Sequence, residues 1–243
     1  MKYIALLLIL FFFSVKISAQ RTVTFPSMDG VTITSDIYDI DSLAPVMLLC
    51  HQAGYSRGEY LETAKRLNKF GFNCVAIDQR SGKECNAIHN ETADAAALAG
   101  KTRNYSDAGQ DIVSAIDFLS NKYHRRIVLL GSSYSASLAL IIAKENEKVC
   151  AVTVFSPGEY LGEKDYVRKK INGLDKPVYS TSSLDEAGDV TELMRDVISK
   201  LKVQFIPRSQ GNHGSKVLWT TNSNNQEYWL TLMAFLSKVK DLK

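Results

Sequence analysis

The chain contains little that would tie it to a metal, a nucleotide or a nucleic acid. It has four histidines, none at helical spacing from another, and its four cysteines form no Cys-x-x-Cys motif, so no metal-binding pattern is present. It also lacks the glycine-rich loop with lysine that holds phosphates. The net charge of +3 is spread along the chain without a basic run, which excludes the usual features of nucleic-acid binding.

Long hydrophobic runs are also scarce, and the one that exists is at the start. Residues 3–13 are apolar, follow Lys2 and precede a more polar segment that ends in small residues. The run is shorter than the roughly 20 residues that span a bilayer. The pattern predicts a signal peptide over residues 1–19, cleaved after Ala19, and therefore export to the periplasm or secretion, without stable membrane insertion after cleavage. An uncleaved anchor is the alternative.

Four cysteines are too few for a fold built on disulfides. Cys50 ends one expected strand and Cys74 begins another, which would place them roughly 10 Å apart on adjacent parallel strands, beyond the reach of a bridge. Cys85 is the better partner for Cys50, and buried free thiols are the alternative. We expect Cys150 to begin a buried strand.

The remaining chain has the pattern of an α/β protein with one domain over residues 20–243. No repeat, low-complexity tract or linker interrupts it, and 45% of the residues are hydrophobic. An Asp-Gly turn joins two alternating runs into a hairpin, after which apolar runs alternate with helical patterns, as in a mostly parallel sheet. The expected strands are 21–27, 31–40, 45–50, 73–78, 125–131, 149–156, 177–183 and 203–208, and the expected helices are 59–71, 106–123, 135–147, 186–201 and 226–240.

The segment from Gly131 to Ser135 joins an expected strand to an expected helix with small residues only, apart from Tyr134. In a doubly wound sheet, ligands bind beyond the carboxyl ends of the strands, where this segment lies. A serine at the apex of such a tight turn, Ser133, would expose its hydroxyl, and small residues two positions away on each side would let strand and helix approach. A serine-rich helix N-cap without a catalytic role is the alternative.

Three stretches resemble motifs of the α/β-hydrolase family, in the order in which that family has them. Gly131-x-Ser133-x-Ser135 resembles the nucleophile elbow G-x-S-x-G, with Ser in place of the last Gly. His51-Gln52-Ala53-Gly54 resembles the oxyanion loop, with Gln in place of Gly, and residues 78–82 resemble the D-x-R-G-x-G segment. The resemblance implies a three-layer fold with an eight-stranded sheet and no large cap domain, nearest to the small dienelactone-hydrolase-like and esterase-like branches.

The resemblance also implies the positions of the other two members of a catalytic triad. His213, after the last strand, stands where the family has its general base. The acid would follow the seventh strand, where both Glu186 and Asp185 stand. The spacing favours Glu186 and residue type favours Asp185, and we prefer Glu186, with Asp189 as a weaker third choice.

By analogy with the family, the backbone N–H groups of Ala53 and Tyr134 would form the oxyanion hole, and the Gln52 side chain would assist or touch substrate. We expect His51 to orient its loop by hydrogen bonds. Candidate residues for the wall of the site are Tyr55, Arg57 and Tyr160.

Together these features predict an exported serine hydrolase that cleaves a small-molecule ester, thioester or amide through an acyl-enzyme and needs no cofactor. A peptidase or acyltransferase on the same fold is one alternative. A secreted binding protein without catalysis is the other, motivated by Gln52 and Ser135, where the chain departs from the family motifs.

Overall fold

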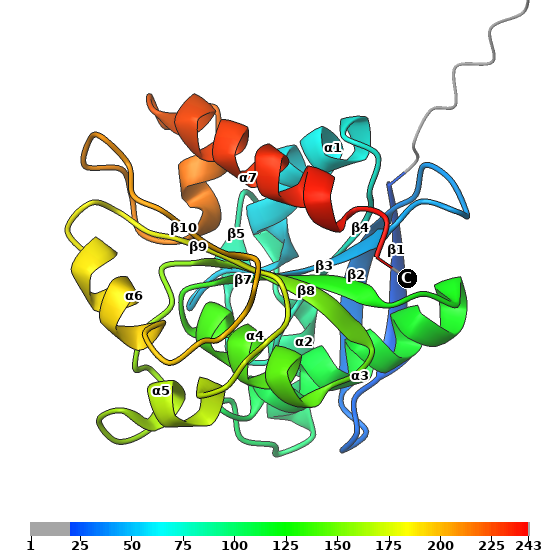
Figure 1. Cartoon of the computed structure of the whole chain (residues 1–243). Helices are drawn as coiled ribbons and strands as arrows, with labels where there is room; N and C mark the ends of the chain where they lie inside the picture. The colour runs from blue at the N-terminus through cyan, green and yellow to red at the C-terminus, as the bar shows by residue number, and fades with distance from the viewer. Residues whose placement is uncertain (1–19, 243) are drawn as a thin grey trace, which may run out of the picture.

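The computed structural model describes residues 20–242, so the expected signal peptide over residues 1–19 lies outside the described residues. The centre of the fold is an eight-stranded sheet in the order β1-β2-β4-β3-β7-β8-β9-β10 (Figure 1). β1 pairs with β2 and β2 with β4 in antiparallel fashion, and all other neighbours are parallel. The strands are β1 Gln20–Pro26, β2 Thr32–Tyr38, β3 Val46–Cys50, β4 Asn73–Ile77, β7 Ile127–Ser132, β8 Val149–Phe155, β9 Val178–Thr181 and β10 Lys202–Phe205.

Helices cover both faces of this sheet and make three layers. The helices and helical turns are η1 Arg57–Tyr60, α1 Leu61–Lys69, α2 Glu91–Leu98, α3 Ala108–Tyr123, α4 Tyr134–Glu145, α5 Tyr166–Ile171, α6 Ala187–Leu193, η2 Ser215–Leu218 and α7 Asn225–Val239. Helices α1 and α7 pack on one face, and α3 and α4 pack on the other (Figure 1). The fold predicted from the sequence, an α/β sheet without a large cap domain, is confirmed.

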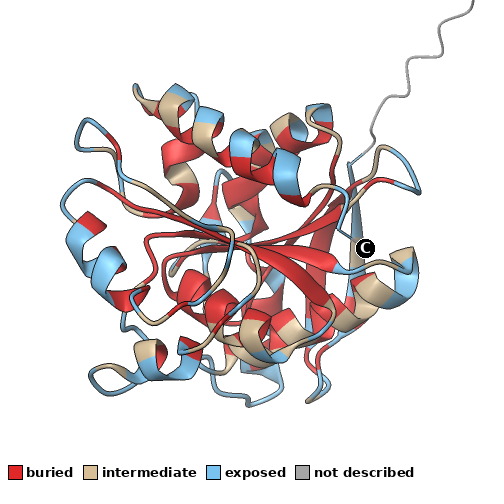
Figure 2. Ribbon diagram, viewed as in Figure 1, coloured by how far each residue is buried: buried red, intermediate tan, exposed pale blue. Residues whose placement is uncertain are grey.

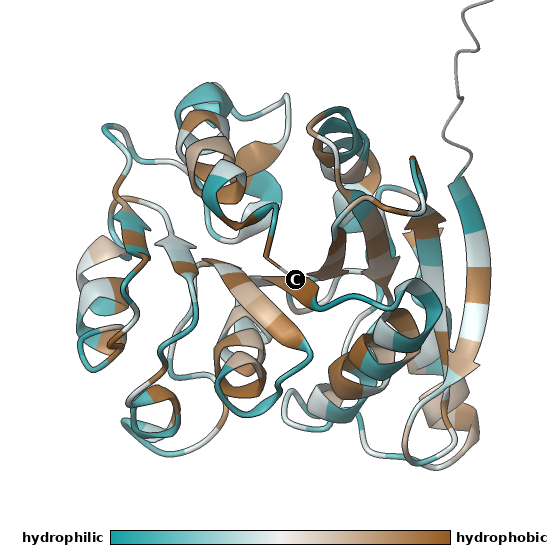
Figure 3. Ribbon diagram, turned by 45° about the vertical axis from the view of Figure 1, so that its right-hand side comes forward, coloured by the Kyte–Doolittle hydropathy of each residue, from teal (hydrophilic) through white to brown (hydrophobic). Residues whose placement is uncertain are grey.

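The buried strands pack on both faces, as their continuous apolar runs predict. In β3, Val46 and Leu48 face the core under α3 and α4, whereas Met47 and Leu49 face the core under α1 and α7. All five residues of β3 are buried, and the inner strands of the sheet are buried along most of their length (Figure 2). The edge strand β1 instead alternates between hydrophilic and hydrophobic residues (Figure 3). The inner strands are thus buried on both faces of the sheet, whereas the edge strand β1 is buried on one face only.

Several local elements differ from the sequence prediction, including the end of α6 and the connection after β4. Helix α6 ends at Leu193, although the pattern predicted a helix to residue 201. Val197 is buried in the core and the Ile198 N–H donates to the Leu174 carbonyl oxygen at 3.0 Å, so the chain leaves the helix to make these contacts. The long connection after β4 also contains a small hairpin, β5 Glu84–Cys85 with β6 Ile88–His89.

All four cysteines of the chain are buried free thiols, so the Cys50–Cys85 bridge considered from the sequence is not formed. Cys50 pairs in register with Ile77, three residues beyond Cys74, as the strand pattern predicted. The side chains of Cys50 and Cys74 also belong to cores on opposite faces of the sheet, which separates them further. Within residues 20–242, no helix is long and apolar enough to span a membrane.

Candidate active site

Ser133 lies alone between the end of β7 and the start of α4, in a backbone conformation that few non-glycine residues adopt. Its φ is 60° and its ψ is −124°. The turn is so tight that a Cβ on Gly131 would lie 2.5 Å from the Ser135 carbonyl oxygen, which explains why only glycine fits there. Strain of this kind is typical of a nucleophile elbow, because the turn lifts the serine out of the sheet at its carboxyl end.

The structure explains why Ser135 stands where the elbow motif has its last glycine. Its buried hydroxyl donates to the Cys50 carbonyl oxygen at 2.7 Å and accepts the Ser132 N–H at 2.9 Å. The hydroxyl therefore joins the elbow to the end of the neighbouring strand β3. The departure from the motif adds two hydrogen bonds and leaves the turn geometry intact.

His213 reaches the elbow from the loop after β10. Its Nε2 lies 2.8 Å from Ser133 Oγ, and its Nδ1 is hydrogen-bonded to Glu186 Oε1. Glu186 comes from the loop between β9 and α6. The imidazole therefore bridges a serine hydroxyl and a carboxylate, an arrangement in which it can accept the serine proton.

Of the two adjacent acids considered from the sequence, the structure brings Glu186 to the histidine. Asp185 is exposed and its carboxylate accepts a hydrogen bond from Gln210. Asp189, the third choice, is exposed on α6 and lines the cavity beside the site. Glu186 and Asp185 are adjacent, but their carboxylates bond different partners, His213 and Gln210.

The Glu186 carboxylate is held by several donors besides the histidine. Its Oε2 accepts the Ser156 hydroxyl at 2.7 Å and the Ser183 N–H at 3.2 Å. Burial raises the pKa of Glu186, but these hydrogen bonds and that from His213 lower it more, to about 2. Glu186 is therefore ionised at neutral pH and can stabilise an imidazolium on His213.

The loop after β3 is fixed by His51, which is fully buried. The Gln79 N–H donates to His51 Nε2 at 2.9 Å, so Nδ1 carries the ring proton and donates to the Gln52 carbonyl oxygen at 2.8 Å. Burial lowers the pKa of His51 to about 4, so the ring is neutral at pH 7. These contacts match the structural role expected of His51.

Ala53, in the loop after β3, and Tyr134, directly after Ser133, have backbone N–H groups without an acceptor among the described residues. Tyr134 is the first residue of α4, where an N–H is left without a partner in its own helix. Ala53 is half-buried in the loop after β3. The Gln52 N–H differs, because it donates to Glu59 Oε2 at 2.8 Å, and the Gln52 side chain is 6% exposed and lies beside Gly214.

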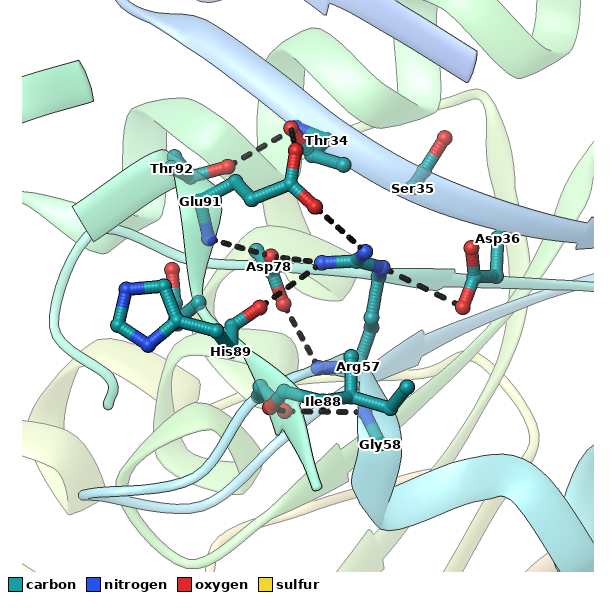
Figure 4. A network of polar contacts seen from close by, with 12 residues as sticks. Thr34, Ser35, Asp36, Arg57, Gly58, Asp78, Ile88, His89, Glu91 and Thr92 are labelled. Carbon is teal, nitrogen blue, oxygen red and sulfur yellow. Dashed lines mark hydrogen bonds and ion pairs between the residues drawn. The ribbon is translucent and has the colours of Figure 1, made fainter. Parts of the chain in front are cut away.

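Arg57, considered as a wall residue from the sequence, is buried in a cluster of acids and is not among the residues that line the cavity near Tyr160. Its guanidinium contacts Asp78 at 2.5 Å, Glu91 at 2.8 Å and Asp36 at 3.3 Å (Figure 4). These acids come from β2, the end of β4 and the start of α2. Because these segments are far apart in the sequence, the cluster could not be recognised from the sequence. Arg57 therefore serves to hold these segments together.

The wall beside His213 is formed by the segment between β8 and α5. Tyr160 is 39% exposed and its ring meets the His213 ring edge-on at 6.5 Å between centroids. Next to it lies a cavity of about 390 Å³, lined by residues that include Pro157, Tyr160, Arg168, Glu186 and Asp189. Because Tyr160 and Glu186 both contact His213 and both line this cavity, part of a substrate could lie here.

Two further side chains at the site were not singled out from the sequence. Ser156, with φ of 51°, accepts the Gly214 N–H at 2.9 Å and so links the histidine loop to Glu186. Glu59 contacts the loops on the other side of the elbow. The position of Ser156 at the end of β8 could have indicated its role from the sequence. Glu59 lies in a helical pattern, and this pattern gives no sign that its side chain is buried.

Two other kinds of reactive group are metal sites and cysteine thiols. Within residues 20–242, no group of three or more His, Cys, Asp or Glu side chains is placed to hold a metal ion. Burial raises the pKa of Cys85 to about 12, so this thiol is protonated at neutral pH and is a poor nucleophile.

Known proteins with this fold include several hydrolases. An esterase from Pyrococcus furiosus is 18% identical, with 91% of this chain and 93% of that chain covered and a TM-score of 0.68. A dienelactone hydrolase from Anabaena variabilis is 16% identical over 91% of this chain and 98% of that chain, with a TM-score of 0.69. An acylaminoacyl peptidase from Pyrococcus horikoshii is 15% identical over 95% of this chain and 43% of that chain, with a TM-score of 0.66.

At these identities the solved structures show a shared fold only. No curated protein sequence matches the chain. The family described as "Serine aminopeptidase, S33" matches residues 41–222, which is most of the chain. Together with the eight-stranded sheet and its order, this match shows that the chain belongs to the serine aminopeptidase family S33 of the α/β-hydrolases.

Proposed function

We propose that the protein is a carboxylic ester hydrolase that works through an acyl-enzyme formed on Ser133. The observation that carries this proposal is the His213 ring, which lies 2.8 Å from Ser133 Oγ on one side and bonds Glu186 on the other. An imidazole held in this way makes a serine hydroxyl nucleophilic, because it takes the proton as the oxygen attacks.

The first half of the reaction forms the acyl-enzyme. Ser133 Oγ attacks the substrate carbonyl carbon while its proton passes to His213 Nε2. The N–H groups of Ala53 and Tyr134 would donate to the oxyanion of the tetrahedral intermediate, and ionised Glu186 would stabilise the imidazolium. When the intermediate collapses, His213 gives the proton to the leaving alcohol and the acyl group stays on Ser133.

The second half releases the acid. Water attacks the acyl carbon, its proton passes to His213, and the same two N–H groups would stabilise the second oxyanion. The proton then returns to Ser133 and the carboxylic acid leaves. The 390 Å³ cavity lined by Tyr160 and Glu186 has room for part of a small or medium substrate.

A rapid-mixing experiment with p-nitrophenyl acetate tests this function. We expect a burst of p-nitrophenol equal to the enzyme concentration, followed by slower turnover, and an acetyl group on Ser133 by mass spectrometry of an acid-quenched sample. Ser133→Ala should show neither signal. Turnover by Ser133→Ala at the wild-type rate would refute the mechanism.

A peptidase is the second candidate, and the family match favours it, because that family is described as serine aminopeptidases. The same groups would cleave an amide, with His213 protonating the leaving amine. Parallel kcat/KM values for acyl p-nitrophenyl esters and for aminoacyl p-nitroanilides distinguish the two. Faster cleavage of an anilide than of the matching ester would assign the protein as a peptidase.

We also propose that residues 1–19 direct export and that residues 20–243 form the mature hydrolase domain. The support is the sequence pattern of a short apolar run after Lys2 that ends in small residues. Expression of the full chain in a bacterium, followed by fractionation and N-terminal sequencing, tests this. A periplasmic or secreted product that begins near Gln20 is expected, and an uncleaved product in the cytoplasm would contradict it.

A further inference from the structure

Glu59 is a fully buried carboxylate that the proposed reaction does not use. It lies in the short helical turn η1, and its side chain has no exposed area. Burial raises the pKa of Glu59, and hydrogen bonds from Ser215, Gln52 and Ser132 lower it only in part. Burying an ionisable side chain is costly, so its presence here calls for a role that an apolar residue could not fill.

The Glu59 carboxylate receives hydrogen bonds from three separate segments of the chain. Oε2 accepts the Gln52 N–H at 2.8 Å, from the loop after β3. Oε1 accepts the Ser132 hydroxyl at 2.9 Å, from the end of β7, and the Ser215 hydroxyl at 2.5 Å, from the start of η2. Ser132 and Ser215 are also joined directly, because the Ser215 N–H donates to Ser132 Oγ at 2.8 Å.

Each of these partners is one or two residues from a group that the proposed reaction uses. Ser132 precedes Ser133, and Ser215 follows His213 by two positions. Gln52 precedes Ala53, whose N–H is a proposed oxyanion donor. A displacement of the Glu59 carboxylate would therefore shift the nucleophile, the base and the oxyanion donor of Ala53 at the same time.

The turn that carries Glu59 is itself firmly held. The Arg57 N–H and guanidinium both bond Asp78, at 2.8 Å and 2.5 Å, and the same guanidinium reaches Asp36 and Glu91 (Figure 4). The Tyr60 hydroxyl donates to the Cys50 carbonyl oxygen at 2.7 Å on the other side of Glu59. The backbone at Glu59 is therefore held in place, and its side chain extends to the three segments that carry Gln52, Ser132 and Ser215.

We propose that Glu59 is a positioning residue, which holds the nucleophile elbow, the histidine loop and the oxyanion loop in the geometry needed for attack on the substrate. Such an anchor changes the rate of the chemical step, because misplacement of reacting groups by even about 1 Å can cost about 100-fold. The inference rests on the proposed function, since it takes Ser133 and His213 as the reacting pair.

The substitution Glu59→Gln tests the carboxylate with almost no change in volume. A carboxylate accepts on both oxygens, whereas an amide accepts on one and donates from the other. If the amide nitrogen faces Gln52, two donors meet. If it faces the serines, at least one hydroxyl loses its acceptor, because Ser132 Oγ already accepts the Ser215 N–H.

The matched control is Glu62→Gln, one helical turn further on. Glu62 is exposed and its carboxylate also bonds a segment beyond the histidine loop, at Thr220, with distances from 3.0 to 3.2 Å. It contacts none of the three segments that meet at Glu59. The two variants therefore make the same chemical change on neighbouring turns.

The experiment measures two quantities for each variant well below its melting temperature. The first is the rate constant for phosphonylation of Ser133 by a fluorophosphonate, and the second is kcat and KM for p-nitrophenyl acetate. We expect Glu59→Gln to lower the phosphonylation rate and kcat about 10- to 100-fold with KM within about threefold of wild type. Glu62→Gln should stay within about twofold of wild type in all three quantities.

The outcomes separate this inference from the proposed function. Wild type that is labelled at Ser133, with Glu59→Gln labelled at the same rate, overturns the positioning role alone, even if that variant melts at a lower temperature. Wild type that is folded but unlabelled refutes the proposed function and removes the basis of the inference.

If Glu59→Gln does not fold, the single variants Ser132→Ala and Ser215→Ala carry the same test. Each removes one hydroxyl from the carboxylate and should lower kcat about three- to tenfold. Because both act through Glu59, the losses in the double variant should be less than multiplicative. Wild-type kcat in both single variants would overturn the proposal.

Discussion

Two carboxylates flank the candidate active site with similar partners, and they differ in what surrounds them. Glu186 accepts a serine hydroxyl and a backbone N–H and bonds the His213 ring, with 29% of its side chain exposed. Glu59 accepts two serine hydroxyls and a backbone N–H with no exposure at all. The pKa is lowered at Glu186 and raised at Glu59.

The difference shows that serine and backbone donors alone do not decide the role of a buried acid. Burial disfavours the ionised form of both carboxylates, but Glu186 keeps contact with water and faces an imidazole that can become charged. Glu59 has neither, so its hydrogen bonds serve mainly to fix the positions of its partners. We therefore assign reaction chemistry to the Glu186 side of the elbow and geometry to the Glu59 side, and the predictions below test this division.

The largest effect is expected at the two residues that would exchange the proton. Ser133→Ala and His213→Ala should each lower kcat by about 10⁵-fold or more, because the first removes the nucleophile and the second removes the base that activates it. The far-UV circular dichroism spectrum should not change, since neither side chain belongs to the hydrophobic cores. Substantial turnover by either variant, measured with p-nitrophenyl acetate, would exclude the pair.

The next largest effect separates the two adjacent acids. Glu186→Gln should lower kcat by about 10³- to 10⁴-fold, because an amide neither fixes the same imidazole tautomer nor stabilises the imidazolium. Asp185→Asn should remain within about twofold of wild type, since Asp185 bonds the exposed Gln210. Similar and mild losses in both variants would mean that neither acid supports His213.

A smaller effect is expected from the serine that holds Glu186. Ser156→Ala removes a hydrogen bond to the Glu186 carboxylate and leaves the Gly214 N–H without its acceptor. We expect kcat to fall about tenfold, because a less firmly held Glu186 would orient His213 less well. The matched measurement is kcat of Ser215→Ala, which loosens the other carboxylate, and an unchanged kcat for Ser156→Ala would argue against an oriented Glu186.

The smallest effect concerns the stability of the fold at acid pH. The pKa of Glu186 is lowered from its ordinary value of 4.5 to about 2 in the folded chain. A carboxyl whose folded pKa is below its unfolded pKa stabilises the fold above pH 4.5, and that stabilisation is lost as the pH falls toward 2.

The measurement that checks this is the urea midpoint of wild type and Glu186→Gln at several pH values. Wild type should be more stable than the variant at pH 7, and the difference should shrink between about pH 4.5 and pH 2. A difference that stays constant over this range would show that the ionised form of Glu186 is not favoured by folding.

The features that the sequence predicted correctly depend on local constraints. The order of strands and helices follows from runs such as β3 and β7, whose short length and continuous apolar residues are typical of strands at the centre of a sheet. The tight turn at Ser133 could be predicted for a similar reason, because it needs small residues at fixed positions on both sides.

What could not be predicted depends on contacts between distant segments. Glu186 and Asp185 are neighbours in one turn, and spacing and residue type gave opposite preferences between them. The contact with His213, 27 residues beyond Glu186, is what separates the two in the structure. Arg57 has the sequence context of an exposed loop residue, but Asp78 and Glu91 lie 21 and 34 residues further along the chain, and Asp36 lies 21 residues before it. Glu59 belongs to the same class, because its serine partners come from β7 and η2.

The central claim is that Ser133 is an activated nucleophile, and its most direct test is intact mass after exposure to a fluorophosphonate, followed by peptide mapping. The reagent requires no knowledge of the substrate. Our account predicts a single adduct on Ser133 in the wild type and none in Ser133→Ala or His213→Ala. A folded wild-type protein without an adduct would contradict it and would favour a binding protein built on the hydrolase fold.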